Sequence, residues 1–294
     1  MSDATVPIDA DLVQRLVSEQ FPEWGRLPVI PVARQGWDNR TYRLGDQLTV
    51  RLPSAAGYVA AIEKENLCLP LLAPYLPLPV PIPVATGRAT DECPFPWSVR
   101  QWLPGETLDA ASDLDLCTVA TDLGSFLVHL RAAPTAGGPA AGRHSFYRGC
   151  PPAVYGDEVR EALQALSATV EVTRCEQVWA AAMDSVWIGH PVWSHGDIAS
   201  GNLLVRDGRL SAVIDFGTCG VGDPACDLVI AWTLFTGESR ALFRRSIGLP
   251  DEAWHRARGW ALWKALITVA WSPDGAQRTE ASRVIAEVLA DPVA

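Results

Sequence analysis

The sequence predicts an α+β fold in which short antiparallel strands come first and helices dominate the remainder. Three observations carry this prediction. Residues 29–53 contain short strand-like runs that turns separate. Residues 114–131, and most of the chain after residue 223, place apolar residues at helical spacing. Between them, residues 202–215 form two apolar runs around an Asp-Gly dipeptide, which is typical of a β-hairpin.

The first third of the chain predicts two helices and a group of antiparallel strands. Asp9 to Gln20 has apolar residues at helical spacing, and Ala61 to Tyr75 shows the same pattern. Residues 76–84 alternate proline with apolar residues, which excludes a helix and requires an extended chain. The strands expected here are 31–33, 41–44, 48–52 and 96–103.

The later chain predicts mainly helices. Asp223 is expected to cap a helix that runs to Phe235, with Pro224 at its first position. One more strand, 191–193, is expected before the hairpin. The remaining expected helices are 114–131, 159–166, 175–186, 238–246, 251–270 and 277–290.

The predicted hairpin brings two polar side chains to one face. A two-residue turn at Asp207-Gly208 pairs Asn202 with Val213 across the hairpin. Asp215 then follows on the same face because strand side chains alternate, so Asn202 and Asp215 become diagonal neighbours about 7–8 Å apart. Two such side chains can converge on one hard cation. The inference depends on the turn, since a slip of one residue would separate them.

Polar residues in this region occur in the order that phosphoryl transfer requires. A His-Gly-Asp run ends at Asp197, Asn202 follows, and an Asp-Phe-Gly run begins at Asp215. In such a layout Asp197 orients the acceptor hydroxyl, and Asn202 and Asp215 hold Mg²⁺ on the nucleotide phosphates. His195 is expected to brace the loop by hydrogen bonding rather than to react.

The segment resembles the aminoglycoside phosphotransferase family, the small-molecule branch of the protein-kinase-like fold. Members carry a His-Gly-Asp-x4-Asn loop and a downstream Asp-x-Gly metal motif, and this sequence matches at each position. The resemblance extends along nearly the whole chain and is strongest from Trp193 to Leu228. It implies a bilobal fold, with a nucleotide-covering, antiparallel-sheet N-lobe over 1–104. A mainly helical C-lobe over 105–294 would carry the catalytic loop, the metal site and the acceptor pocket, with Mg²⁺ and either ATP or GTP as cofactors.

The resemblance also implies a phosphate clamp in the N-lobe. Arg51 stands where the kinase fold has its nucleotide-pairing lysine, and arginine is likewise a fixed cation that binds phosphate oxygens. Glu65 best matches the spacing of the family's helical glutamate and would pair with Arg51, and Glu63 is the alternative. If Arg51 instead faces solvent on an edge strand, the clamp lies elsewhere.

Two further nucleotide contacts follow from the same resemblance. The loop 35–39, with Gly36 and Asn39, matches the position of the phosphate-covering loop, although it lacks the three glycines of protein kinases. The strand that ends near Gln101 and Leu103 matches the hinge, where main-chain groups meet the adenine.

The acceptor pocket is expected between the catalytic loop and the C-terminal helices. Carboxylates there would suit a cationic aminosugar, whereas a tryptophan-rich pocket would favour a less polar acceptor such as a macrolide. Most of the tryptophans are expected to serve the core. Asp223 and Asp227 are explained as helix-capping and first-turn carboxylates, with acceptor contact as the alternative. The candidate liners are Trp232, Glu238, Trp254, Trp260, Trp263 and Trp271, and the other available carboxylates are Asp251 and Glu252.

The expected function is transfer of the γ-phosphoryl group to a hydroxyl of a small molecule. The family's namesake substrates make an aminoglycoside-like antibiotic one candidate acceptor, with antibiotic resistance as the role. Macrolide, choline, homoserine and sugar kinases share the motifs. A catalytically idle nucleotide-binding module is the competing class. Arg51 and the unusual phosphate loop are its only support, and the intact catalytic and metal residues oppose it.

Composition sets the remaining expectations. The 294 residues carry a net charge of −10, which argues against a nucleic-acid surface. The acidic N-terminus lacks a signal-peptide pattern, and no run is apolar for long enough to span a membrane. The seven scattered cysteines are typical of reduced thiols in the cytoplasm. The expected assembly is a monomer or a homodimer.

Overall fold

The computed structural model describes residues 7–36 and 38–291 of the chain. Trp37 of the predicted phosphate-covering loop lies outside the described residues, as do the outermost parts of the two predicted lobes, 1–6 and 292–294.

The described residues form two compact units. The first runs to Gly105 and also contains Ser211–Gly217, and the second comprises Glu106–Leu210 and the chain from Thr218 onward. The sequence-based division assigned all residues after 104 to the second lobe, so the return of 211–217 to the first unit is a correction. It depends on long-range hydrogen bonding, such as the 3.3 Å bond from the Val213 N–H to the carbonyl oxygen of Pro79, which no local pattern encodes.

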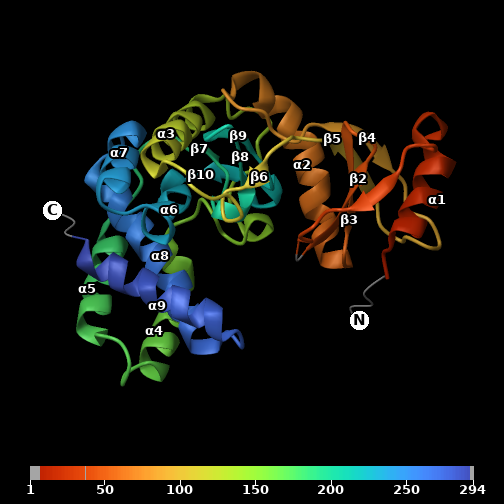
Figure 1. Ribbon diagram of the computed structural model, residues 1–294. Coiled ribbons are helices and arrows are strands. Elements are labelled where there is room, and N and C mark those ends of the chain that lie inside the picture. Colours follow the sequence, from red (N-terminus) through yellow and green to blue (C-terminus); the bar gives the residue numbers. More distant parts are fainter. Residues whose placement is uncertain (1–6, 37, 292–294) are drawn as a thin grey trace. The chain divides into compact units, whose positions relative to one another are not determined.

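The first unit is built on a five-stranded antiparallel sheet with the order β1-β2-β3-β5-β4 (Figure 1). Thr41 lies opposite Arg51, and Arg51 lies opposite Ser98, so these side chains share one face of the sheet. β4 was not predicted as a strand. It lies at the sheet edge, where a strand can begin with a proline such as Pro83. The strands are β1 (Val29–Pro31), β2 (Asn39–Leu44), β3 (Leu48–Pro53), β4 (Pro83–Gly87) and β5 (Trp97–Gln101).

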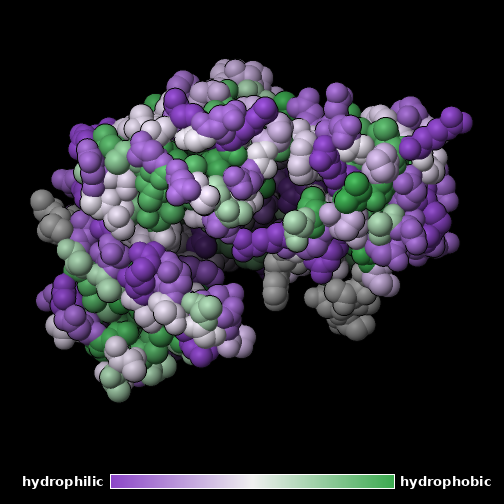
Figure 2. Space-filling model, in the orientation of Figure 1, coloured by the Kyte–Doolittle hydropathy of each residue, from purple (hydrophilic) through white to green (hydrophobic). Residues whose placement is uncertain are grey.

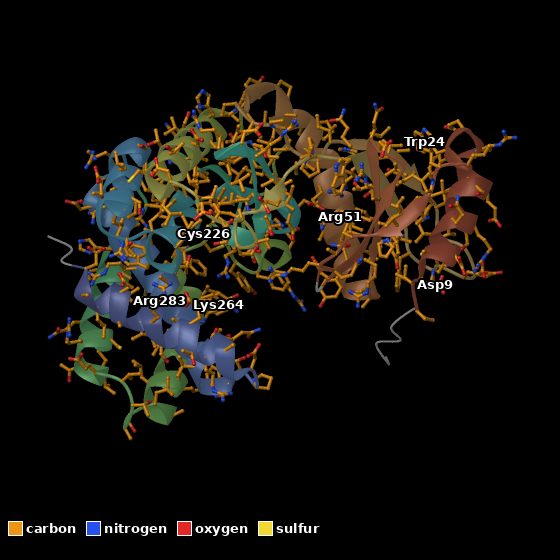
Figure 3. All side chains as sticks on the ribbon, in the orientation of Figure 1. Asp9, Trp24, Arg51, Cys226, Lys264 and Arg283 are labelled. Carbon is orange, nitrogen blue, oxygen red and sulfur yellow. The ribbon has the colours of Figure 1, made fainter. Side chains whose placement is uncertain are left out.

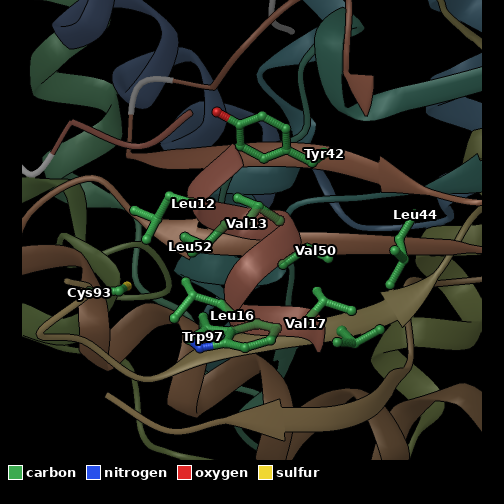
Figure 4. Packing of buried hydrophobic residues seen from close by; sticks show 11 residues of the cluster. Leu12, Val13, Leu16, Val17, Tyr42, Leu44, Val50, Leu52, Cys93 and Trp97 are labelled. Atoms are coloured by element: carbon green, nitrogen blue, oxygen red, sulfur yellow. The ribbon is translucent and has the colours of Figure 1, made fainter. Parts of the chain in front are cut away.

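Helix α1 (Ala10–Gln20) covers the opposite face of this sheet. Its N-cap is Asp9, whose carboxylate accepts a 2.8 Å hydrogen bond from the Leu12 N–H. The apolar stripe of α1 packs on strand residues that include Val50 and Trp97, and Figure 4 shows the helix lying over them. Because strand side chains alternate, the residues on either side of Val50 and Trp97 point away from this core, toward the site described below.

Helix α2 (Val59–Leu72) follows the predicted pattern and is continued by the 3₁₀ turn η3 (Ala73–Tyr75). Its buried residues include Ile62, Cys68 and Leu69, which are apolar, and Lys64 and Glu65, which are charged. Charged residues are rarely buried in full unless they are paired, so the buried side of α2 contains polar interactions as well as apolar packing.

The second unit contains two small antiparallel strand pairs. β6 (Glu106–Thr107) pairs with β8 (Leu203–Arg206), and β7 (Val192–Ser194) pairs with β10 (Gly220–Gly222). The predicted turn at Asp207-Gly208 leads from β8 into β9 (Arg209–Val213), and both turn residues have the positive φ of a tight hairpin. β6 and β10 were not predicted, because neither contains a run of apolar residues.

The helices of the second unit pack mainly on α8. Helices α4, α5 and α9 all contact α8, and α3 packs against α7. The six predicted long helices are all present. The helices are α3 (Leu116–Ala132), α4 (Gly156–Ala165), α5 (Val172–Asp184), α6 (Ile230–Thr233), α7 (Gly237–Ile247), α8 (Asp251–Trp271) and α9 (Gly275–Ala290).

The single helix predicted over residues 223–235 is wrong. Asp223 is an N-cap and Pro224 follows it as predicted, but the turn is a 3₁₀ helix, η8 (Pro224–Leu228), and the short α6 comes after it. Almost every residue of this segment is buried, so burial has no helical period that could separate one long helix from two short turns.

The exterior of each unit mixes polar and apolar residues, and hydrophilic residues predominate on the face that Figure 2 shows. No helix in residues 7–36 and 38–291 has both the length and the apolar character that crossing a membrane requires. The seven cysteines, all of which lie in these ranges, form no disulfide.

Candidate active site

A tight loop follows β7 and carries the His-Gly-Asp run. Gly196 has a φ of 85°, and an added Cβ there would lie 2.7 Å from the carbonyl oxygen of Thr218, so this position requires glycine. His195 is fully buried, and Asp197 is exposed. The loop thus presents the Asp197 carboxylate to solvent, while the His195 side chain anchors the loop in the interior.

Asp227 braces this loop from within the second unit. One of its carboxylate oxygens accepts a 2.8 Å hydrogen bond from the His195 N–H, and the other accepts a 2.7 Å bond from the Gly196 N–H. Only 2% of Asp227 is exposed. Burial raises the pKa of Asp227, and the charge of His195 and the two N–H donors oppose that shift. The alternative of acceptor contact is wrong for Asp227, because loop amides occupy both of its oxygens.

The raised pKa of Asp227 predicts a specific pH dependence of stability. The folded protein binds this proton more readily than the unfolded chain does, so the stabilisation from Asp227 is largest in acid and decreases as pH rises through the raised pKa. Asp227→Asn abolishes this titration. The wild type should therefore lose stability relative to the variant as pH rises from about 4 toward neutrality. Urea unfolding of both proteins across that range tests this, and a difference that is constant, or that grows in favour of the wild type, would contradict it.

Asp197 is held at both its main chain and its side chain. Its N–H lies 3.2 Å from Nδ1 of His195, which accepts the bond. The Asn202 side-chain amide donates to the Asp197 carbonyl oxygen (2.9 Å) and to its carboxylate (3.0 Å). His195 therefore has the bracing position that was expected, and Asn202 contacts the candidate base directly.

The strand geometry expected for Asn202 and Asp215 is wrong. Asn202 ends the 3₁₀ turn η6 (Ser200–Asn202) just before β8 begins. Asp215 lies beyond the end of β9 and has a positive φ of 67°. Side-chain alternation applies only within a strand, so the predicted common face does not follow from the hairpin register. Local turns fix both side chains instead.

In the first unit, Arg51 of β3 lies between two carboxylates. Its guanidinium is 3.1 Å from a Glu65 oxygen and 3.3 Å from an Asp215 oxygen, and the Arg51 side chain is 12% exposed. Burial alone lowers the pKa of Arg51, but Glu65 and Asp215 outweigh it and leave that pKa raised. The predicted Arg51–Glu65 pair is present, and the solvent-facing alternative for Arg51 is wrong. Figure 3 labels Arg51 on the sheet.

Glu65 joins the sheet to the Asp-Phe-Gly run. This fully buried carboxylate pairs with Arg51, lies 3.0 Å from a guanidinium nitrogen of Arg100, and accepts a 2.9 Å hydrogen bond from the Phe216 N–H. Glu63 is exposed on the other side of α2. The structure thus decides between the two glutamates in favour of Glu65.

Sequence reasoning missed Arg100. It is fully buried on β5, and its guanidinium also donates to the Ser98 hydroxyl (2.9 Å). Burial and the like charge of Arg51 lower the pKa of Arg100, which Glu65 counteracts. An arginine within a predicted strand was a usable signal, since a buried cation requires a partner.

The Glu65 cluster predicts a large loss of stability. Glu65→Gln would leave Arg100 without its carboxylate and Arg51 with one instead of two. Removing one partner of a buried ion pair costs about 3–5 kcal/mol of unfolding free energy. Urea unfolding measures the loss, with Glu63→Gln on the same helix as the matched control. A loss no larger than that of the control would contradict the assignment.

The other predicted nucleotide contacts differ in their surroundings. Gly36 is exposed, and its carbonyl oxygen accepts a 2.9 Å bond from Arg40. Asn39 is buried, and neither polar atom of its side chain has a hydrogen-bond partner among the described residues. The Gln101 N–H donates a hydrogen bond to the carbonyl oxygen of Ile82. The main-chain N–H and C=O of Leu103 form no hydrogen bond with any residue that the structure describes.

Asp38, beside Asn39, is a further residue that the sequence reasoning passed over. Burial, and then the negative charge of Asp215, raise the pKa of Asp38, while Arg51 opposes the shift. Its carboxyl therefore lies within electrostatic range of the Arg51 cluster. An aspartate is common in turns, so the local sequence did not indicate that the Asp38 side chain would face the Arg51 cluster.

The proposed acceptor liners are mostly core residues. Trp232, Trp254, Trp260 and Trp263 are buried, as the core interpretation expects. Asp223 is also buried, and its carboxylate pairs with Arg256 at 2.6 Å. These observations agree with the helix-capping role expected for Asp223. The exposed candidates are Glu238, Asp251, Glu252 and Trp271.

Comparison with known proteins agrees with this arrangement. A model of the phosphotransferase enzyme family matches residues 29–260. An aminoglycoside 3′-phosphotransferase of Escherichia coli is 38% identical over 58 residues, which are 19% of this chain and 21% of that protein. That alignment thus spans about a fifth of the relative's length.

Solved structures show the same fold. The GDP complex of wild-type aminoglycoside 2′-phosphotransferase-IIIa has a TM-score of 0.70 at 17% identity, covering 96% of this chain and 99% of that one. The macrolide 2′-phosphotransferase MphH from Brachybacterium faecium, solved as the apoenzyme, has a TM-score of 0.61 at 24% identity, covering 94% and 98%. The predicted kinase-like α+β fold is confirmed. Since the family model spans most of its length, the chain belongs to the phosphotransferase enzyme family.

Proposed function

We propose that the protein transfers the γ-phosphoryl group of ATP or GTP to a hydroxyl of a small molecule, with Asp197 as the base. The observation that carries this proposal is the exposed Asp197 carboxylate on a loop that Asp227 and Asn202 hold in place. The acceptor oxygen forms a bond to the γ-phosphorus while the bond from that phosphorus to the bridging oxygen breaks. The nucleoside diphosphate leaves, and Asp197 accepts the hydroxyl proton.

Asn202 and Asp215 are the proposed Mg²⁺ ligands. Asn202 uses its NH₂ group on Asp197, and in the described chain its amide oxygen accepts no hydrogen bond, which suits an oxygen ligand. No group of three or more His, Cys, Asp or Glu side chains among the described residues could hold a metal. That fits Mg²⁺, which takes one or two protein carboxylates besides water and phosphate oxygens. When bound, Mg²⁺ neutralises charge that develops on the phosphates.

Arg51, held by Glu65, is the proposed phosphate clamp. Its guanidinium is fixed and always charged, so it can replace the lysine of protein kinases. Gly36 and the unsatisfied amide of Asn39 would serve the phosphate-covering loop. The main chain of Leu103, with Gln101 beside it, would meet the base. The GDP bound in the related 2′-phosphotransferase makes GTP a candidate donor beside ATP.

The acceptor belongs to the same proposal. An aminoglycoside-like antibiotic is one candidate, with resistance as the role, and a macrolide, choline, homoserine or a sugar are the others. An idle nucleotide-binding module is disfavoured, because Arg51 has its glutamate and Asp197 its supports. We place the protein in the cytoplasm as a monomer or homodimer without nucleic-acid partners, on the basis of its acidic charge and its disulfide-free cysteines.

The test is nucleoside diphosphate release from ATP and from GTP, with and without Mg²⁺, across a panel of these acceptors. Acceptor-stimulated, metal-dependent release names the substrate class and the donor. Tight nucleotide binding without any metal-dependent turnover would contradict the proposal and support the idle module.

A further inference from the structure

Two cations lie beside the catalytic loop in the second unit. Arg148 packs on Gly196, since a Cβ added to that glycine would lie 3.0 Å from the Arg148 Cβ. The Arg148 guanidinium lies 4.8 Å from the ring centroid of Trp260 and 4.8 Å from that of Trp263. The Lys264 ammonium lies 6.0 Å from the Trp263 ring, and Figure 3 labels Lys264 on α8. Cation–π contacts thus fix the direction of the Arg148 side chain, whose Cβ lies beside the glycine that precedes Asp197.

Neither cation is neutralised by a direct contact. Across residues 7–36 and 38–291, the side chains of Arg148 and Lys264 make no hydrogen bond and no ion pair. Arg256, also in the second unit, shows the contrast, because its guanidinium pairs with Asp223. An arginine carries five N–H donors, and in a half-buried position they require acceptors.

The neighbouring carboxylates do not neutralise the positive charge of Arg148 and Lys264. Partial desolvation, and then the like charge of Arg148, lower the pKa of Lys264, although its side chain reaches solvent. The carboxylates of Asp197 and Glu158 act in the opposite direction. Glu158, however, accepts a 2.9 Å hydrogen bond from the Trp263 indole N–H, and Asp197 is the proposed base. Binding an anion would therefore relieve the repulsion between the two cations.

Aromatic rings border the same place. Tyr155 stacks on Trp263 with ring centroids 3.9 Å apart and an interplanar angle of 16°, and Tyr147 meets Tyr155 edge-on at 6.3 Å. The turn that presents Tyr147 holds two non-glycine residues at positive φ, Phe146 at 48° and Tyr147 at 56°. Such backbone strain persists where the surrounding structure enforces it and concentrates at functional sites. Here the Tyr155 hydroxyl fastens the turn through the carbonyl oxygen of Phe146 at 2.9 Å.

We infer that the acceptor carries an anionic group, a carboxylate or a phosphate, close to the hydroxyl that receives the phosphoryl group, together with a ring or apolar face. Arg148 and Lys264 bind the anion, and the rings of Tyr147 and Tyr155 line the apolar face. A guanidinium matches a carboxylate or phosphate in two parallel hydrogen bonds. The same two cations repel a polycationic aminosugar. The inference rests on the proposed function and narrows its acceptor.

The test compares acceptors in matched pairs with Mg²⁺ and either nucleotide. The probes are uronic acids against their amides, sugar phosphates against the neutral sugars, and kanamycin as the polycation. We expect kcat/KM for the anionic member to exceed that of its neutral partner by about tenfold to a hundredfold, the range of one or two charge-assisted hydrogen bonds.

Variants assign the effect to residues. Arg148→Gln and Lys264→Gln should each lower the ratio of kcat/KM for the anionic acceptor to kcat/KM for its neutral partner about tenfold or more, and should not raise the nucleotide KM. Arg148→Lys should restore part of the loss. Arg160→Gln is the control, because Arg160 is exposed and pairs only with Asp157 of its own helix among the described residues. Lys264 is exposed, so its variant tests the inference even if Arg148→Gln does not fold.

Three results would overturn the inference. Kanamycin or the neutral partners could be the better acceptors. The variants could raise the nucleotide KM instead, which would assign the cations to the donor phosphates. Finally, the protein could show an Asp215-dependent basal hydrolysis of nucleotide that no anionic probe alters. The phosphotransferase proposal would then stand, and the inference of an anionic acceptor would fall. Absence of any Mg²⁺-dependent turnover would instead remove the proposed function itself.

Discussion

Replacing Asp215 by asparagine should reduce Mg²⁺-dependent phosphoryl transfer by about a thousandfold. The carboxylate is the only charged ligand in the proposed metal site, and an amide binds a hard cation more weakly. A metal supplies several kcal/mol of transition-state stabilisation, and about 4 kcal/mol corresponds to roughly a thousandfold in rate. Arg51 would also lose one of its two carboxylate partners. The measurement is kcat as a function of Mg²⁺ concentration, and the concentration for half-saturation should rise.

Asp207→Asn is the matched control for this change. Asp207 lies in the hairpin turn with its side chain 89% exposed and a φ of 53°, a conformation that asparagine adopts readily. The control should retain wild-type kinetics. If Asp215→Asn kept the wild-type response to Mg²⁺, the metal site would lie elsewhere.

Asp197→Asn should lower kcat by about a hundredfold to ten-thousandfold, the usual contribution of a positioned general base. The side-chain amide oxygen of the variant could still accept the hydrogen bond that Asn202 now donates to the Asp197 carboxylate, so the loop should keep its shape. Nucleotide affinity should therefore be unchanged, and the loss should appear in kcat rather than in the nucleotide KM.

Asp157→Asn serves as the control for the base, since that aspartate is 84% exposed and only pairs with Arg160 among the described residues. Steady-state kinetics of the three proteins, together with nucleotide binding by titration, separate the two effects. If Asp197→Asn lost nucleotide binding as severely as turnover, Asp197 would be a structural residue rather than the base.

The elements that the sequence predicted well are those with a strong local signal. Helix α1 has its cap and its apolar stripe within one segment, and the Asp207-Gly208 turn defines its hairpin. The edge strand β4 and the two-turn segment after Asp223 were missed or wrong. Their form depends on which neighbours cover them, and the local pattern of prolines or buried residues does not contain that information.

The site divides in the same way. The order of Asp197, Asn202 and Asp215 pointed to the chemistry, and the family resemblance pointed to the pair of Arg51 and Glu65. Partners that come from distant segments were not accessible to such reasoning. Asp227 reaches the loop amides from 31 positions along the chain, and Arg100 reaches Glu65 across the first unit. Alternation along β5 places Arg100 on the same face as Ser98, but only the register of the sheet brings both to Arg51.

The central claim is that this chain transfers a phosphoryl group to an acceptor hydroxyl by the residues named above. It is tested most directly by following γ-³²P-labelled ATP and GTP in the presence of Mg²⁺ and the acceptor panel. Label should appear in a phosphate monoester of one acceptor in equal amount to the nucleoside diphosphate formed. Both products should vanish with a chelator, and their rate of formation should fall at least about a hundredfold with Asp197→Asn. Release of labelled inorganic phosphate alone, unaffected by every acceptor and by Asp197→Asn, would contradict the account.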